Sequence, residues 1–108
     1  MQIPLQIAAP DVDLSPADKA LIRRRATKLE LFYPRITACR VLVDTPRRQR
    51  NAREFVVHID LTFPGGELVV TRQPSPELTT AIQVAFQAAE RQLEDFKERR
   101  AARRVAGA

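Results

Sequence analysis

The sequence of 108 residues contains a single cysteine, three glycines and no tryptophan. One cysteine excludes an intrachain disulfide and a cysteine-rich metal site. No apolar run approaches the roughly 18 residues that a membrane-spanning helix needs. The first ten residues lack the basic start and cleavage site of a secretory signal. We therefore expect a cytoplasmic chain without a membrane partner, and its length predicts one domain.

Basic residues outnumber acidic residues in this chain. It carries 18 Lys and Arg against 13 Asp and Glu, a net charge of +5, and most of the bases are Arg. Guanidinium groups grip phosphate through two hydrogen bonds, so this balance favours nucleic acid or an acidic surface as the partner. Hydrophobic residues make up 44% of the chain, which is enough for one modest core.

Residues 54–72 show the clearest local pattern. Five apolar residues, Phe55, Val57, Ile59, Leu61 and Phe63, alternate with Val56, His58, Asp60 and Thr62. A period of two is typical of a strand with one buried face. Pro64, Gly65 and Gly66 then supply turn chemistry before a second alternating run. The pattern predicts two antiparallel strands whose apolar face is covered by helices.

Two further strands and the first helix are predicted upstream. Residues 2–8 alternate, and Pro4 favours an edge strand because proline donates no ladder hydrogen bond. Residues 36–44 alternate likewise. Ser15, Pro16 and Asp18 predict a capped helix start, and the helix should run to about Tyr33. Its apolar stripe comprises Leu21, Ile22, Ala26, Leu29 and Phe32.

A second helix is predicted after residues 74–77, a Pro-Ser-Pro-Glu start of the same kind as the first. Its stripe at helical spacing comprises Leu78, Ile82, Ala85, Phe86, Ala89, Leu93 and Phe96. The order β-α-β-β-β-α then predicts an α+β fold, a four-stranded mixed sheet with two helices packed on one face. Residues 1–97 would form this single domain, and 98–108 a basic, flexible tail.

Bases cluster in three segments. The first helix carries Lys19, Arg23, Arg24, Arg25 and Lys28 against two acids. Arg25 falls within the apolar stripe, so its stem must snorkel or it lies at an end of the sheet where a ligand binds. The loop at 45–53 carries Arg47, Arg48, Arg50 and Arg53. The last cluster begins with Lys97, Arg99 and Arg100. These segments are candidates for phosphate contacts.

The sequence offers little support for a catalytic site or a metal site. His58 and Asp60 share one strand face but have no nucleophile or further ligands beside them, so a surface cross-strand pair is favoured. Cys39 shares one strand face with Val41 and Val43 and is predicted to be core. There is no nucleotide-binding glycine loop. We expect no enzyme, no cofactor and no bound metal.

In this order of elements, the chain resembles the bacterial ribosome hibernation-promoting factor and ribosome-associated inhibitor family. The likeness covers residues 1–97, through KLELFYPRI at 28–36, CRVLVD at 39–44, HIDLTFPGGELVV at 58–70, AI at 81–82 and RQLEDFK at 91–97. The resemblance implies the β-α-β-β-β-α fold. It also implies a translation inhibitor that occupies the messenger and transfer RNA channel of the small ribosomal subunit, as a short form monomeric off the ribosome.

The chain departs from that family in its second helix. The family's usual Asp-x-Tyr and Ala-Ile-Asp segments correspond to residues 77–83, ELTTAIQ, and Ala88 stands where a lysine is usual. The exposed face of this helix is therefore less basic, and the 47–53 loop can substitute for it. Residues expected to contact ribosomal RNA are Arg23, Arg24, Arg25, Lys28, Arg47, Arg48, Arg50, Arg53, Arg91, Lys97, Arg99 and Arg100.

Two other function classes stay open. One is a non-ribosomal RNA-binding module, and a double-stranded-RNA binder is the nearest because it shares the last α-β-β-β-α elements. The other is a protein–protein regulatory domain that uses the open face of the sheet, at Leu42, Val56 and Val69. A steep salt dependence of binding would indicate phosphate contacts and separate the two.

Overall fold

The sheet and both helices are those that the sequence predicts. The computed structural model describes residues 4–45, 48–49 and 52–106, and only the backbone at 48–49, 52–53 and 103–106. The main elements are β1 (Leu5–Ala8), α1 (Pro16–Phe32), β2 (Ala38–Asp44), β5 (Val56–Phe63), β6 (Gly66–Thr71) and α2 (Leu78–Ala106). In the 45–53 segment the structure adds two-residue strands, β3 (Arg48–Gln49) and β4 (Ala52–Arg53).

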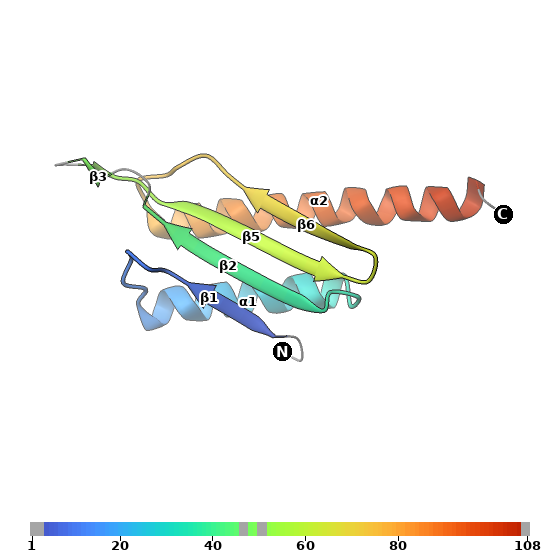
Figure 1. Cartoon of the computed structure of the whole chain (residues 1–108), viewed down its shortest axis with the longest axis horizontal. Helices are drawn as coiled ribbons and strands as arrows, with labels where there is room; N and C mark the ends of the chain where they lie inside the picture. Colours follow the sequence, from blue (N-terminus) through green and yellow to red (C-terminus); the bar gives the residue numbers. More distant parts are fainter. Residues whose placement is uncertain (1–3, 46–47, 50–51, 107–108) are drawn as a thin grey trace.

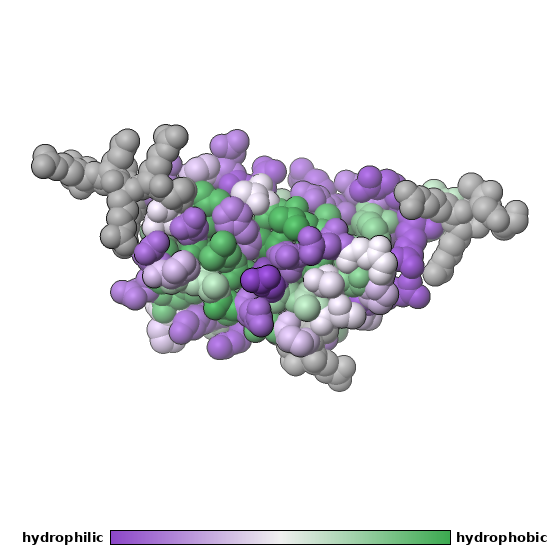
Figure 2. Space-filling view, viewed as in Figure 1, coloured by the Kyte–Doolittle hydropathy of each residue, from purple (hydrophilic) through white to green (hydrophobic). Residues whose placement is uncertain are grey.

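The sheet has the order β1-β2-β5-β6, with β1 parallel to β2 and the other neighbours antiparallel. β1 is therefore an edge strand, as predicted. Both helices lie side by side on one face of the sheet and run in the same direction (Figure 1). The opposite face is left open, and Figure 2 shows it as apolar patches interrupted by hydrophilic residues.

The core lies between the helices and the inward side of the strands. Val57, Ile59 and Leu61 are at most 1% exposed, and the α2 residues Ile82 and Phe86 are fully buried against the same cluster. His58 and Asp60 point to the open face and are half-buried. The alternation in 55–63 thus identifies correctly which face the helices cover.

The start of α1 follows the predicted capping box. The Ser15 hydroxyl accepts a hydrogen bond from the Asp18 N–H at 3.1 Å, and the Asp18 carboxylate accepts one from the Ser15 N–H at 3.0 Å. These bonds satisfy donors that the first turn of a helix otherwise leaves unpaired. The first turn of α1 is therefore stabilised by two residues that lie three apart in the sequence.

The end of α1 differs from the prediction. Phe32, expected in the buried stripe, is 40% exposed, whereas Tyr33 is only 6% exposed. Tyr33 is the C-cap, with φ −135° and ψ 87°, so the chain leaves helical geometry there and the ring turns towards the core. It packs edge-on against Phe63 and Phe96, with ring centroids 5.7 and 5.9 Å away.

Val56 was expected on the open face, but it is buried, with 8% exposure. It lies beside the bridge in which Phe55 and Ser75 exchange two backbone hydrogen bonds, of 2.8 and 3.0 Å. The same bridge explains why α2 begins at Leu78 rather than directly after Ser75. Because the N–H and C=O of Ser75 are bonded to Phe55, Ser75 is held in an extended pairing.

The far end of α2 extends past the predicted domain boundary at Lys97. Residues 98–106 continue the helix to Ala106, so the predicted basic tail is helical there. Its composition of Ala, Arg and Glu favours helix, and no Gly or Pro occurs before Gly107. This end of α2 projects beyond the sheet (Figure 1), and its expected flexibility stays a prediction.

The β5–β6 hairpin closes through Pro64 and Gly65, since Phe63 pairs with Gly66. Gly65 has φ 85°, a conformation that a residue with a Cβ adopts only with strain. Gly66 belongs to β6 and is needed for a different reason. A Cβ placed there would lie 2.9 Å from the Phe63 ring, so the backbone can approach the ring only because the side chain is absent.

Candidate nucleic-acid interface

The bases of α1 separate along two edges of the helix. Lys19 and Arg23 lie on the β1 side, where they line a groove with Leu5 and Ile7. Lys28 lies on the α2 side, within 3.5 Å of a carboxylate of that helix. Arg24 is exposed one turn before Lys28. These bases therefore lie on two flanks of the buried stripe, and each flank has a different neighbourhood.

Arg25, the base within the predicted stripe, joins the two helices. Its Nη2 lies 3.1 Å from Glu90 Oε1, and its side chain is 18% exposed. The guanidinium carbon is also 6.0 Å from the centre of the Phe86 ring. The stem therefore crosses the core surface and its charge is neutralised at the α1–α2 seam. This contact leaves Arg25 little freedom to reach an external phosphate.

Lys28 shares the same carboxylate but keeps most of its surface. Its Nζ is 3.5 Å from Glu90 Oε1, and 66% of its side chain is exposed. An ion pair at this exposure contributes little to stability and can be broken easily. Lys28 and the exposed Arg24 are therefore the α1 bases on this side that can contact a ligand phosphate.

On its other side, α2 presents Arg91 together with Arg72, the residue that follows β6. Both line a shallow hollow of about 140 Å³ between helix and strand, with Gln87 and Gln92. Arg72 was not among the predicted contact residues. The sequence shows only that Arg72 follows the last strand. Its position beside α2 depends on the hairpin being folded over that helix.

The bases at the far end of α2 fill several roles. Lys97 donates to the Phe32 carbonyl at 3.4 Å and lies 4.6 Å from the centre of the Phe32 ring. It therefore supports the C-terminus of α1, where a positive charge is favourable. Arg99 is exposed and donates to the Asp95 carbonyl at 3.4 Å, while Arg100 is half-buried.

The strands β3 and β4 lie at the end of the molecule opposite the projecting end of α2 (Figure 1). Arg48 and Arg53 pair in register across β3 and β4, which turns part of the predicted loop into a small antiparallel ladder. Arg47 and Arg50 lie outside the described residues. The expected contact residues are thus spread along a molecule 58 Å long, rather than gathered in one cluster.

The acid–base and thiol candidates take structural positions in the sheet. His58 Nδ1 lies 2.9 Å from the Thr71 hydroxyl, a cross-strand pair between β5 and β6. Cys39 is 1% exposed, and burial, with the nearby Asp60 charge, raises its pKa to about 12. Within residues 4–45, 48–49 and 52–106, no group of three metal-ligating side chains comes together. None of the described helices is both long and apolar enough to cross a membrane.

Residues 5–101 match the family model described as sigma 54 modulation protein / S30EA ribosomal protein. A search of the curated proteins finds no match. Among solved structures, a ribosomal subunit interface protein from Coxiella burnetii is 17% identical, with a TM-score of 0.74 over 89% of this chain and 99% of that one.

The N-terminal domain of Protein Y from Thermus thermophilus is 18% identical, with a TM-score of 0.68 over the same shares of the two chains. At these identities the two structures establish the fold alone. The family match covers nine-tenths of the sequence, and it extends past Lys97 into the helical segment that projects from the sheet.

Proposed function

The chain belongs to the family of sigma 54 modulation and S30EA ribosomal proteins, and on that basis we propose that it binds the small ribosomal subunit and inhibits translation. It would occupy the channel of messenger and transfer RNA through its exposed bases, in the cytoplasm and as a monomer when off the ribosome. The family consists of binding proteins, and the chain is not an enzyme.

The observation that supports this function best is the exposure of Arg24 and Lys28 on the flank of α1. The helix buries Ile22, Ala26 and Leu29, yet Lys28 keeps 66% of its side chain exposed. These bases therefore contribute little to folding and remain available to phosphate. Each phosphate contact releases about one counterion, which supplies affinity without reading sequence.

The distribution of bases supports a long, shallow contact. Arg91 and Arg72 lie beside α2, Arg99 lies on its projecting end, and the strands β3 and β4 lie at the other end. Glu90 weakens the centre of this surface because it pairs with Arg25 and Lys28. A nucleic acid that followed the helical face would therefore meet stronger attraction towards the two ends than at the seam.

The test is sedimentation of the purified protein with isolated small and large ribosomal subunits, followed by competition. We expect it to travel with the small subunit and to be displaced by a short messenger RNA together with deacylated transfer RNA. It should also inhibit translation of a reporter message in a purified system. Binding that both RNAs leave unchanged would contradict the channel, and absence from the small-subunit peak would contradict the ribosomal function.

A non-ribosomal double-stranded-RNA module remains the alternative, since the exposed helix bases would also suit a duplex. The same gradients distinguish the two when a ribosome-free RNA duplex of about 16 base pairs is included, because such modules span about that length. A protein that binds the duplex tightly and ignores the subunit would favour the alternative.

A further inference from the structure

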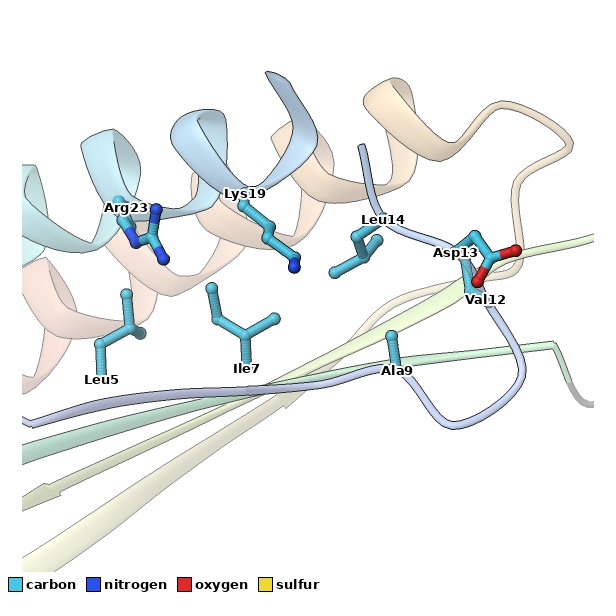
Figure 3. A pocket seen from close by; sticks show the side chains of 8 residues that line it. All are labelled: Leu5, Ile7, Ala9, Val12, Asp13, Leu14, Lys19 and Arg23. Atoms are coloured by element: carbon cyan, nitrogen blue, oxygen red, sulfur yellow. The ribbon is translucent and has the colours of Figure 1, made fainter. Parts of the chain in front are cut away.

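A groove of about 650 Å³ runs between β1 and the first half of α1. Figure 3 shows Leu5 and Ile7 rising from β1 into this space, with Leu14 closing one end of it. All three side chains are half-buried and pack against the core from its margin. The helix therefore covers the edge strand incompletely and leaves an apolar floor open to solvent. We call this space the β1 groove.

The strand that forms the floor is also a free edge. β1 pairs only with β2 in the sheet, so within the described residues its outer side has no neighbouring strand. An edge strand presents N–H and C=O groups that can accept an added strand. The residues Leu5–Ala8 include none of the charged side chains that commonly protect such edges.

The wall of the groove is cationic. Lys19 and Arg23 lie one helical turn apart, both are exposed, and Figure 3 shows both side chains directed over the apolar floor. Among the described residues, neither side chain has an ion-pair partner. Asp13 stands at the other end of the groove, beside Leu14. The groove is therefore apolar along its floor, positive along most of one wall and negative at one end.

We propose that the β1 groove binds an extended, acidic peptide segment of another protein, which adds to the sheet as a strand beside β1. The segment's backbone would pair with the free edge, and the side chains on its α1-facing side would be apolar over Leu5 and Ile7 and acidic beside the wall. Its carboxylates would meet Lys19 and Arg23. Since β1 spans four residues, the recognised segment would be about four to six residues long.

The three features together favour such a peptide over other occupants. RNA could neutralise Lys19 and Arg23, but its phosphates would leave the apolar floor uncovered. A second copy of this chain would bring a net charge of +5 and an identical basic wall to the same edge. Only an extended chain of opposite charge satisfies the strand edge, the floor and the wall at once. The proposal is independent of ribosome binding.

The experiment uses the full chain and a fluorescein-labelled peptide of six residues with blocked ends, Glu-Thr-Val-Thr-Glu-Thr, whose two glutamates and central valine share one face of a strand. Two control peptides have lysine in place of glutamate, or proline in place of the central valine, which removes a donor needed for strand pairing. Fluorescence anisotropy should show saturable binding of the first peptide and binding at least about tenfold weaker for both controls. Amide shifts in the nuclear magnetic resonance spectrum should concentrate on residues 4–9 and 13–23.

A pair of charge-reversed proteins tests the wall. The double variant Lys19→Glu, Arg23→Glu should bind the acidic peptide at least about tenfold more weakly. The matched variant Arg24→Glu, Lys28→Glu has the same net charge and should bind it within about twofold of wild type, because those bases lie on the other edge of α1. Absence of saturable binding to wild type, equal losses in both variants, or undiminished binding of the proline peptide would each overturn the proposal.

Discussion

Arg25 and Glu90 join the two helices across 3.1 Å, and Lys28 approaches the same carboxylate oxygen at 3.5 Å. A single acid of α2 thus neutralises bases of α1 that a phosphate would otherwise attract. Glu90 is half-buried, so solvent screens this charge less than it screens a carboxylate at the surface. The pairing makes Glu90 an intramolecular competitor of any phosphate that approaches the seam.

Replacement of Glu90 by Gln should therefore strengthen binding to small subunits. We expect affinity at about 50 mM salt to rise about three- to tenfold, because Lys28 is released and a negative charge is removed. Glu94→Gln is the matched control. It removes the same charge from an exposed position of the next helical turn and should change affinity less. Equal gains from both variants, measured by filter binding, would show a net-charge effect and no competition.

Among the described residues, the buried hydroxyl of Tyr33 has no hydrogen-bond partner, while its ring packs against Phe63 and Phe96. Tyr33→Phe should leave the free energy of unfolding unchanged or raise it by about 1 kcal/mol, since an unpaired buried polar group is removed. Tyr33→Ala should lower it by about 3–5 kcal/mol through the lost ring. Urea unfolding measures both. A loss of stability in the Phe variant would reveal a partner for the hydroxyl.

The two faces of β5 predict unequal costs of truncation. Leu61 is fully buried under the helices, so Leu61→Ala should cost about 2–5 kcal/mol by forming a cavity. His58 lies on the open face and pairs there with the Thr71 hydroxyl, so His58→Ala should cost less than about 1 kcal/mol. Comparable losses in chemical denaturation would contradict the assignment of the faces.

Cys39 predicts a loss of stability at alkaline pH. Burial and the Asp60 charge raise its pKa from 9.0 to about 12, so the folded protein disfavours the thiolate. The unfolded chain ionises this thiol first, and the stability associated with it is present below pH 9 and lost between pH 9 and 12. Between pH 8 and about 10.5, wild type should lose about 2 kcal/mol more than Cys39→Ala. Parallel losses of unfolding free energy in both proteins would contradict this.

Local patterns in the sequence predict most of the fold, because each depends on nearby residues. The capping box needs only Ser15 and Asp18, and the buried face of β5 follows from alternation. The positions that differ depend on contacts distant in sequence. Val56 is buried beside the Phe55–Ser75 bridge, and Tyr33 turns inward against rings of β5 and α2.

The candidate interface is less predictable for the same reason. Helical spacing separates Lys19 and Arg23 from Arg24 and Lys28, which the structure confirms. Spacing alone gives no information about the element that lies beside each flank. The pairing of Arg25 with Glu90, 65 residues away, depends on α1 and α2 running in the same direction side by side. Arg72 likewise reaches Arg91 only through the folded hairpin.

The bases on the α2 side of α1 lead to the central prediction. Arg24→Glu with Lys28→Glu should weaken small-subunit binding about 10- to 100-fold at low salt and leave the thermal melt unchanged, since neither residue fills the core. The single variant Arg24→Glu should also weaken binding, and Arg40→Glu is its matched control. It reverses an exposed arginine on the open face of the sheet, and it should leave affinity nearly unchanged.

The most direct measurement is a filter-binding titration of wild type and the double variant on purified small subunits between about 50 and 200 mM salt. Wild-type affinity should fall by about 10³-fold over this range if six phosphate contacts form. The double variant should bind more weakly. The slope of log affinity against log salt concentration should be smaller in magnitude by about two, one for each missing phosphate contact. A double variant that melts like wild type and binds with the same affinity and the same slope would contradict the account.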